Sequence, residues 1–156
     1  MSLDTEHRRL CHALLDAIEQ GDLAAVEACY APHMTMWANV TNAESSREEN
    51  LEALRKGKSL HRRRTYNDRM INTFEDGFVA QYTIDVVALN GAKVSLSACL
   101  VAQVHDGTIV KLFDYLDLRP HGLRRRSARR RRRPGAGQAA GRRVAPTGAA
   151  VGPLSG

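Results

Sequence analysis

The amino-acid sequence predicts an α+β fold in which three N-terminal helices pack on a curved antiparallel sheet. Apolar residues recur at helical spacing in the first part of the chain, whereas apolar and polar residues alternate from residue 63 onwards. Helices and strands are therefore segregated along the sequence, which is the pattern of α+β domains. A sheet of this kind can curl around its helices and leave a pocket between the two layers.

The first two helices are predicted from apolar spacing and from residues that suit helix ends. Residues 3–20 carry leucine, cysteine and isoleucine side chains at helical spacing, and Gly21 suits the C-terminal cap. Asp22 can cap a second, shorter helix through about Tyr30, which Pro32 closes. The chain is therefore expected to open with two helices that are separated by a glycine-aspartate break.

A short extended segment and a third helix follow. Residues 34–39 alternate as a strand would. Ser45 and Ser46 each begin a capping box whose glutamate lies three residues later, so two such boxes overlap. A third helix is therefore expected to run to about Lys58.

Beyond the third helix the pattern changes to strands and tight turns. Asn90-Gly91 is a strong hairpin signal, since both residues tolerate positive φ. His105-Asp106-Gly107 turns the chain into the last strand. Four strands in a meander are predicted, over residues 63–74, 78–89, 92–104 and 108–118.

Charge divides the chain into an expected domain, residues 1–118, and a basic tail, residues 119–156. The first part holds 12 basic and 17 acidic residues, a net charge of −5, whereas the tail holds 11 arginines and no acid. The tail is predicted to be disordered, and two explanations of its arginines stay open: association with nucleic acid, or a reading of the gene outside its native frame. Within the domain, the basic run His61–Arg64 is expected to be a solvated edge or a lip over the pocket, with an anion site as the alternative.

The cysteines and histidines predict neither a disulfide framework nor a metal site. Cys11, Cys29 and Cys99 are odd in number and widely spaced, which is typical of buried thiols in a reducing cytoplasm. His7 and Cys11 are four residues apart, but no third ligand is evident, so no metal or other cofactor is expected. No apolar run approaches the roughly 18 residues that a membrane span needs, and the polar N-terminus does not resemble a signal peptide. A cytoplasmic protein without membrane contact is expected.

The last predicted strand carries a carboxylate on an apolar face. Alternate side chains of a strand face opposite sides, so Leu112, Asp114 and Leu116 share one face. A carboxylate between apolar neighbours must be hydrogen-bonded, paired or protonated. Asp114 is therefore a candidate acid or base, with a solvated aspartate at a strand end as the alternative.

Three motifs of the chain resemble the nuclear transport factor 2-like superfamily and, within it, the SnoaL-like group. They are IEQGDL at 18–23 with YAP at 30–32, MWAN at 36–39, and DGTIV at 106–110 with DYLD at 114–117. The resemblance covers roughly residues 8–118. It implies a cone-shaped, cystatin-like α+β barrel with an internal apolar pocket, and commonly a homodimer through the sheet.

Ketosteroid isomerase belongs to that superfamily, but its catalytic residues are not matched here. Its general base, its oxyanion tyrosine and its second oxyanion acid correspond to Ala38, Leu14 and Leu100 of this chain. All three positions are apolar, so the resemblance does not imply ketosteroid isomerase chemistry by that mechanism.

Limonene epoxide hydrolase gives a closer match, because its final segment is similar to DYLDL here. The resemblance makes Asn39, Asp85 and Asp114 the equivalents of that family's polar site residues. The family's tyrosine is Trp37 in this chain. Its arginine, which sits between the two carboxylates and holds them in different protonation states, is replaced by Thr83.

Periodicity leaves two of these assignments open. Asp85 shares its strand face with Gln81 and Thr83, so this face is either an outward polar stripe or a polar wall of the pocket. Trp37 and Asn39 also share a face. The tryptophan is either simply packed or part of the pocket wall, and a buried asparagine could position water or a ligand carbonyl.

These observations predict a pocket protein for a small hydrophobic cyclic compound. Asp114 would give or take a proton, Asp85 would assist, and Asn39 would position water or a polar substrate group, without a cofactor. Isomerisation or epoxide hydrolysis fits this arrangement, and the alternative is a non-catalytic binding module with the same pocket. The residues expected to line the pocket are Trp37, Leu14, Tyr82, Leu100, Leu112 and Leu116.

Overall fold

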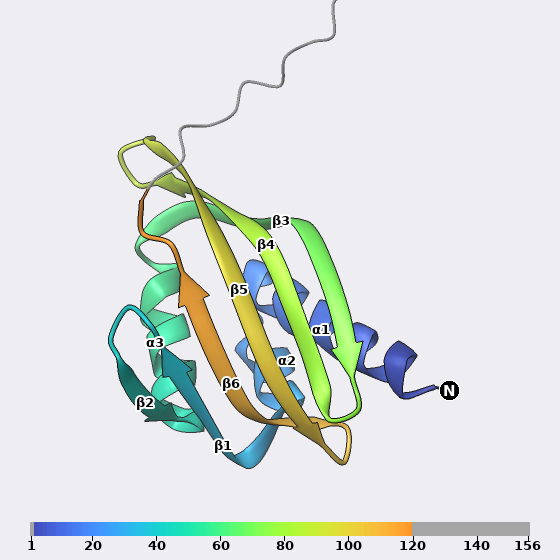
Figure 1. Ribbon diagram of the computed structural model, residues 1–156. Coiled ribbons are helices and arrows are strands. Elements are labelled where there is room, and N and C mark those ends of the chain that lie inside the picture. The colour runs from blue at the N-terminus through green and yellow to red at the C-terminus, as the bar shows by residue number, and fades with distance from the viewer. Residues whose placement is uncertain (1, 120–156) are drawn as a thin grey trace, which may run out of the picture. The chain divides into compact units, whose positions relative to one another are not determined.

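The computed structural model of the protein describes residues 2–119 (Figure 1). The predicted tail lies outside the described residues except for Arg119, and so do the predictions of its disorder and of its association with nucleic acid. The observed elements follow the predicted order, with one short strand added. They are α1 (Leu3–Gln20), α2 (Leu23–Cys29), β1 (Tyr30–Ala38), β2 (Ala43–Ser46), α3 (Arg47–Lys58), β3 (His61–Phe74), β4 (Gly77–Ala88), β5 (Lys93–His105) and β6 (Thr108–Leu116).

Gly21, Asp22 and Ser46 cap helices as predicted, and Ser2 is a further cap at the start of α1. At the start of α1 the Ser2 hydroxyl accepts a hydrogen bond from a first-turn amide at 3.3 Å, and Gly21 ends the helix with a φ of 69°. At α3 the capping box forms between Ser46 and Glu49, so Ser46 rather than Ser45 caps the helix. All three predicted helices are confirmed. Within residues 2–119, none of them has both the length and the apolar composition needed to cross a membrane.

The six strands form one open sheet in the order β2-β1-β6-β5-β4-β3. Strands β3 to β6 make the predicted antiparallel meander. Strand β1 pairs in parallel with β6, and the two strands at the ends of the order, β2 and β3, do not pair with each other. The α+β class is therefore confirmed, whereas the sheet is mixed and open where an antiparallel barrel was expected. Alternation within a strand does not specify which neighbour it pairs with, or in which direction.

The first strand is longer than the sequence indicated. It begins at Tyr30, directly after α2, and contains Pro32. A proline is tolerated there because the pairing with β6 is interrupted between Tyr30 and Thr35. Strand β2 was missed because its four residues are too few to give a recognisable alternation.

The helices cover one face of the sheet, which we call the inner face, and leave the other, the outer face, uncovered. The outer face is turned towards the viewer in Figure 1, with the helices behind it. Inner-face side chains pack with α1 and α2 into one core, in which Leu14, Val26, Phe78 and Ile109 are fully buried. Between the β-bulges, a side chain of the meander therefore meets the helices or an open surface according to its parity along the strand.

Candidate functional site

Asp114 lies on the inner face, on the strand at the centre of the sheet. It pairs with Ala38 in β1 and with Leu100 in β5, and both of these residues are buried. Asp114 itself is only half-buried, although Leu112, two residues earlier on the same face, is 2% exposed. The residue is therefore partly accessible, although it lies on the face that the helices cover.

The surroundings of Asp114 favour its protonated form. Burial raises the pKa of the carboxyl group above its ordinary value, and the positive charge of Arg64 partly opposes this effect. A carboxyl group with a raised pKa can donate a proton closer to neutral pH and is a stronger base once it has lost that proton. Asp114 thus has the electrostatic character of an acid–base group.

Three tyrosines lie close enough to Asp114 to feel its charge. Burial raises the pKa of Tyr30, Tyr66 and Tyr82, that of Tyr66 to about 12, and Asp114 contributes to the increase in all three. The Tyr30 hydroxyl donates a hydrogen bond to Oδ1 of Asn50 at 3.0 Å, and the rings of Tyr66 and Tyr82 pack with centroids 5.4 Å apart. The three phenols therefore keep their protons at neutral pH and act as polar groups in an otherwise apolar interior.

Arg64 brings a positive charge to the same interior. It pairs with Val86 and lies two residues before Tyr66 on β3, so it shares the inner face. Its guanidinium carbon is 5.6 Å from the centroid of the Tyr66 ring, and its Nε is buried without a hydrogen-bond partner. Arg62 and Arg63 are exposed, as expected of a solvated edge, whereas Arg64 is half-buried. Arg64 therefore turns towards the interior, and the half-buried His61 lines one small cavity together with it.

Asp85 lies on the outer face, away from Asp114. It pairs with Thr65 and Ser95, and its carboxylate accepts a hydrogen bond from Nδ2 of Asn67 at 2.8 Å. The structure therefore does not bring the two predicted carboxylates together, and the hypothesis that Asp85 assists Asp114 has no geometric support. The alternation along β4 explains the result, because Asp85 belongs to the polar stripe and not to the apolar face that the helices cover.

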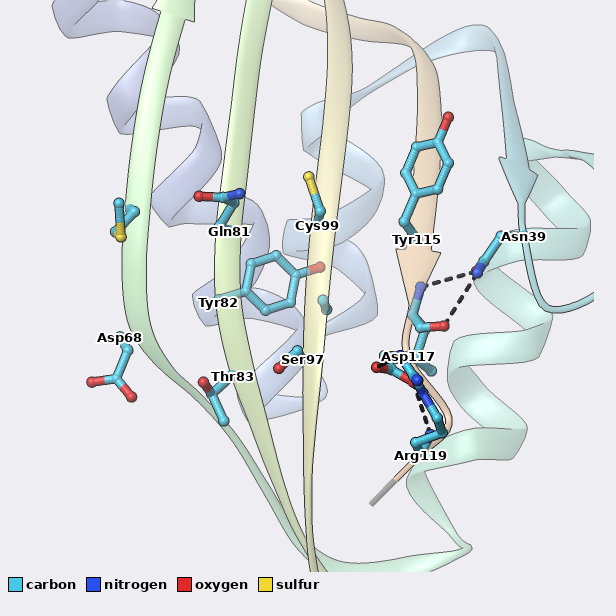
Figure 2. A pocket seen from close by; sticks show the side chains of 13 residues that line it. Asn39, Asp68, Gln81, Tyr82, Thr83, Ser97, Cys99, Tyr115, Asp117 and Arg119 are labelled. Carbon is cyan, nitrogen blue, oxygen red and sulfur yellow. Dashed lines mark hydrogen bonds and ion pairs between the residues drawn. The ribbon is translucent and has the colours of Figure 1, made fainter. Parts of the chain in front are cut away.

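Asn39 and Trp37 are also placed differently from the prediction. Oδ1 of Asn39 accepts a hydrogen bond from the backbone amide of Leu116 at 2.9 Å, and its Nδ2 donates one to the Leu116 carbonyl at 3.2 Å (Figure 2). This amide continues the pairing of β1 with β6 past the end of β1, so both of its polar atoms are occupied by backbone. Trp37 packs on the outer face against Tyr115, with ring centroids 5.5 Å apart.

Most of the residues predicted to line the pocket do lie on the side of Asp114. Leu14 projects from α1 and is fully buried. The others occupy the inner face of the sheet and belong to the core or pack against it. The interior around Asp114 is therefore largely apolar, and Trp37 is not part of it. The inner-face residues are Tyr82, Leu100, Leu112 and Leu116.

The outer face carries a shallow cavity of about 700 Å³, which Figure 2 shows from close by. Its lining is mixed and includes the polar side chains of Gln81, Thr83 and Ser97 on β4 and β5. A second cavity, of about 720 Å³, lies where the first turns of α1 meet the hairpin turns of the sheet, and His7 and Asp106 are among its lining residues. Neither cavity includes Asp114 or Arg64, so both are separate from the interior acid.

No metal-ligand set is found in residues 2–119, where no three His, Cys, Asp or Glu side chains gather as ligands would. The three cysteines are free thiols. Burial raises the pKa of the Cys11 thiol to about 12, which keeps it protonated and unreactive at neutral pH. Within residues 2–119, Asp114 and Arg64 form no ion pair, whereas the largely buried Arg69 pairs with Asp16 and Glu19.

Comparison with known families identifies the domain. The profile of the SnoaL-like domain matches residues 11–112, which is most of the described part of the chain. The chain belongs to the SnoaL-like domain family. This membership confirms the nuclear transport factor 2-like resemblance that the sequence motifs indicated. A search of curated proteins finds no match.

Solved structures resemble this SnoaL-like domain in fold. A candidate polyketide cyclase from Xanthomonas campestris pv. campestris is 21% identical, covers 75% of this chain and 94% of its own, and gives a TM-score of 0.68. AclR, a candidate hydroxylase from Streptomyces galilaeus, is 18% identical, with coverages of 74% and 92% and a TM-score of 0.68. IdmH, a candidate polyketide cyclase from Streptomyces antibioticus, is 17% identical, with coverages of 70% and 91% and a TM-score of 0.65. At these identities the likeness establishes the fold alone.

Sequence reasoning missed Tyr30 and Tyr66 of the SnoaL-like interior, and it named Arg64 only as part of the basic run His61–Arg64. Arg64 and Tyr66 are two residues apart on one strand, so their shared face was readable, but the run of basic residues suggested a solvated edge. Tyr30 was taken as a helix end, whereas it begins β1. No local signal showed that these side chains share an interior with Asp114, because they come from strands that are distant in sequence.

Proposed function

We propose that this SnoaL-like protein binds a small, hydrophobic, cyclic carbonyl compound between the helices and the inner face, and that Asp114 transfers a proton to or from it without a cofactor. The observation that carries this proposal is the position of Asp114. It is a partly accessible carboxyl group with a raised pKa, and it stands on an apolar and aromatic face of the sheet. Such a group is suited to general acid–base work.

Isomerisation or ring closure is the reaction class that one such group can support. The Asp114 carboxylate takes a proton from a carbon next to a carbonyl, and the electron pair of that C–H bond forms the enolate. In an isomerisation the proton returns to another carbon of the same molecule. In a ring closure the enolate carbon attacks a second carbonyl, and the resulting alkoxide takes the proton from Asp114. The names of two structural neighbours, candidate polyketide cyclases, support the second possibility.

The placement of the carboxylates favours these reactions over epoxide hydrolysis by a carboxylate pair. In the family that suggested epoxide hydrolysis, an arginine lies between two carboxylates. Here Asp85 lies on the outer face with Asn67, and Asn39 is occupied by the backbone of Leu116. We therefore assign the proton transfer to Asp114 alone.

The second candidate function is non-catalytic binding of the same class of compound. The observation that favours it is the apolar character of the positions that carry catalytic groups in ketosteroid isomerase, since Leu14, Ala38 and Leu100 are all buried here. An acid without such partners could serve only to recognise a polar group of the ligand. Turnover, rather than affinity, separates the two functions.

The test begins with ligands and ends with one substitution. The purified protein is screened by thermal shift against steroids, terpene epoxides and polyketide-like aromatic compounds, because a ligand that binds only the native state raises its stability. Compounds that bind are then tested for conversion by the wild type and by Asp114→Asn. The enzyme proposal expects conversion that the substitution abolishes, while the variant still binds. Conversion that survives in Asp114→Asn contradicts it, and binding without conversion by the wild type favours the second function.

We further propose that the protein forms a homodimer through its outer face. This face carries the aromatic pair Trp37 and Tyr115, of which Tyr115 is 42% exposed, and Met70 is 61% exposed beside the shallow cavity. Exposed apolar and aromatic residues on an uncovered sheet are suited to association. Light scattering after size exclusion is expected to give twice the mass of the chain, and Tyr115→Glu is expected to reduce it to that of one chain. A wild-type mass of one chain would overturn this proposal.

A cytoplasmic location stays a prediction. The free state of Cys11, Cys29 and Cys99 agrees with a reducing compartment.

A further inference from the structure

We propose that the ligand of the interior presents an anionic or enolisable oxygen to Arg64, which makes Arg64 the residue that positions the ligand and determines its class. The inference rests on the proposed function, because it places the ligand beside Asp114. It narrows the class of ligand, since a purely hydrocarbon or cationic compound offers no such oxygen.

The first argument is the unsatisfied state of the guanidinium group. An arginine has five N–H donors and no acceptor. Nε of Arg64 is buried without a partner, and none of the ion pairs found in residues 2–119 includes this side chain. The face of the Tyr66 ring attracts the charge but offers no lone pair in the plane of the N–H groups. Buried N–H groups normally donate a hydrogen bond, so an oxygen acceptor is the group that would complement Arg64.

The second argument is the relation between Arg64 and Asp114. Both face one interior, and Arg64 is near enough to lower the pKa of Asp114 against the effect of burial. They nevertheless form no ion pair in the described part of the chain, so their charges are not in contact. We place the ligand between them, with a carbonyl oxygen at Arg64 and the adjacent carbon at Asp114.

The third argument is chemical. When Asp114 removes a proton from that carbon, the electron pair of the broken C–H bond forms the carbon–carbon double bond of an enolate. The π pair of the carbonyl group then moves onto its oxygen, so negative charge develops there. A guanidinium group fixed beside that oxygen stabilises the charge more than it stabilises the neutral carbonyl. The same geometry binds a ligand that is already anionic, such as a carboxylate or a phenolate.

A nearby space allows a competing, purely structural explanation. A cavity of about 30 Å³ borders Arg64, Glu19 and His61, and a space of this size holds about one water molecule. A water there could satisfy one N–H group, with the arginine serving only to stabilise the fold. This explanation predicts that the arginine has no influence on which ligands bind.

The test compares two ligands that differ only in charge, 2-naphthoate and 2-naphthamide, by titration calorimetry at pH 7. The wild type is expected to bind the anion more tightly than the amide, by about tenfold to a hundredfold, as for a hydrogen bond to a charged group. Arg64→Met, which keeps the length of the side chain without its charge, should remove this preference by lowering the affinity for the anion more than the affinity for the amide. The matched control is Arg63→Met, since Arg63 is exposed one residue away and carries the same charge.

The proposal is overturned if Arg64→Met keeps the preference, or if the wild type binds the anion no better than the amide. Arg64→Lys is the second variant in case Arg64→Met does not fold, because it keeps the charge but not the planar fork. A reduced preference in Arg64→Lys supports the proposal, and an undiminished one contradicts it. The outcome is separable from that for Asp114: an intact anion preference together with full turnover in Asp114→Asn would refute the proposed function and leave the role of Arg64 standing.

Discussion

The inner and outer faces of this sheet place the same residue type in different surroundings. Asp114 and Asp85 are both aspartates within strands of the meander. On the outer face Asp85 accepts a hydrogen bond from Asn67 at 2.8 Å, whereas on the inner face burial raises the pKa of Asp114. Both residues are half-buried, but the helices cover only the face that carries Asp114. Position under the helices, rather than residue type, makes an aspartate of this sheet a candidate for chemistry.

The largest expected effect is on turnover, once the thermal-shift screen has provided a substrate. Asp114→Asn should lower kcat by about 10²- to 10⁴-fold, the usual contribution of a general acid or base. Asp85→Asn should change kcat by no more than a few-fold, because its carboxylate lies on the other face. Steady-state kinetics of the two variants compare the faces directly. An equal loss in both variants would mean that the faces do not differ in the way proposed.

Stability should also distinguish the two faces. Phe78 is fully buried on the inner face, so Phe78→Ala should lower the free energy of unfolding by about 3–5 kcal/mol. Phe113 is half-buried on the outer face, and Phe113→Ala should cost clearly less. Urea denaturation at several protein concentrations provides the measurement. A cost for Phe113→Ala that grows with protein concentration would indicate that the outer face is covered by a second copy.

A smaller effect on stability is expected at the start of α3, where Ser45 and Ser46 are the two possible N-cap residues. Ser46→Ala should lower the free energy of unfolding by about 1 kcal/mol, since it removes the hydroxyl that accepts from the Glu49 amide at 3.2 Å. Ser45→Ala should cost less, because the Ser45 hydroxyl makes only a 3.3 Å hydrogen bond to the Met36 carbonyl. Thermal denaturation of the two variants decides between the overlapping capping boxes, and a larger loss in Ser45→Ala would reverse the assignment.

The smallest effect is a pH dependence of stability that comes from Asp114. Its folded-state pKa is raised above the ordinary 3.8, so between these two values the folded protein binds more protons than the unfolded chain. The contribution of Asp114 to stability is therefore most favourable at low pH and is lost as pH rises through the folded pKa. Asp114→Asn removes this loss. The free energy of unfolding of the variant should therefore rise relative to that of the wild type as pH increases from 4 to 7. A stability difference that stays constant over this range, measured by urea denaturation, would contradict the raised pKa.

Much of the fold could be predicted from local patterns. The span of α1, the cap at Ser46 and the turns at Asn90-Gly91 and Asp106-Gly107 depend on residues a few positions apart, so the sequence displays them directly. The parallel pairing of β1 with β6 could not be predicted, because it joins segments that are far apart in sequence and whose alternation is compatible with several neighbours. Family motifs supplied the fold class independently of these patterns.

The residues of the candidate site also differ in whether local patterns or distant pairings determine their positions. The sequence by itself determined that Asp114 stands on an apolar face, because its neighbours at alternate positions are leucines. It also displayed the polar stripe of Asp85, but not on which side of the sheet the helices would pack. Only the tertiary structure decided that Arg64 and the tyrosines share the interior with Asp114, while Asp85 and Trp37 face outward. The physical reason is that burial and charge act through space, between strands whose register and direction no local pattern specifies.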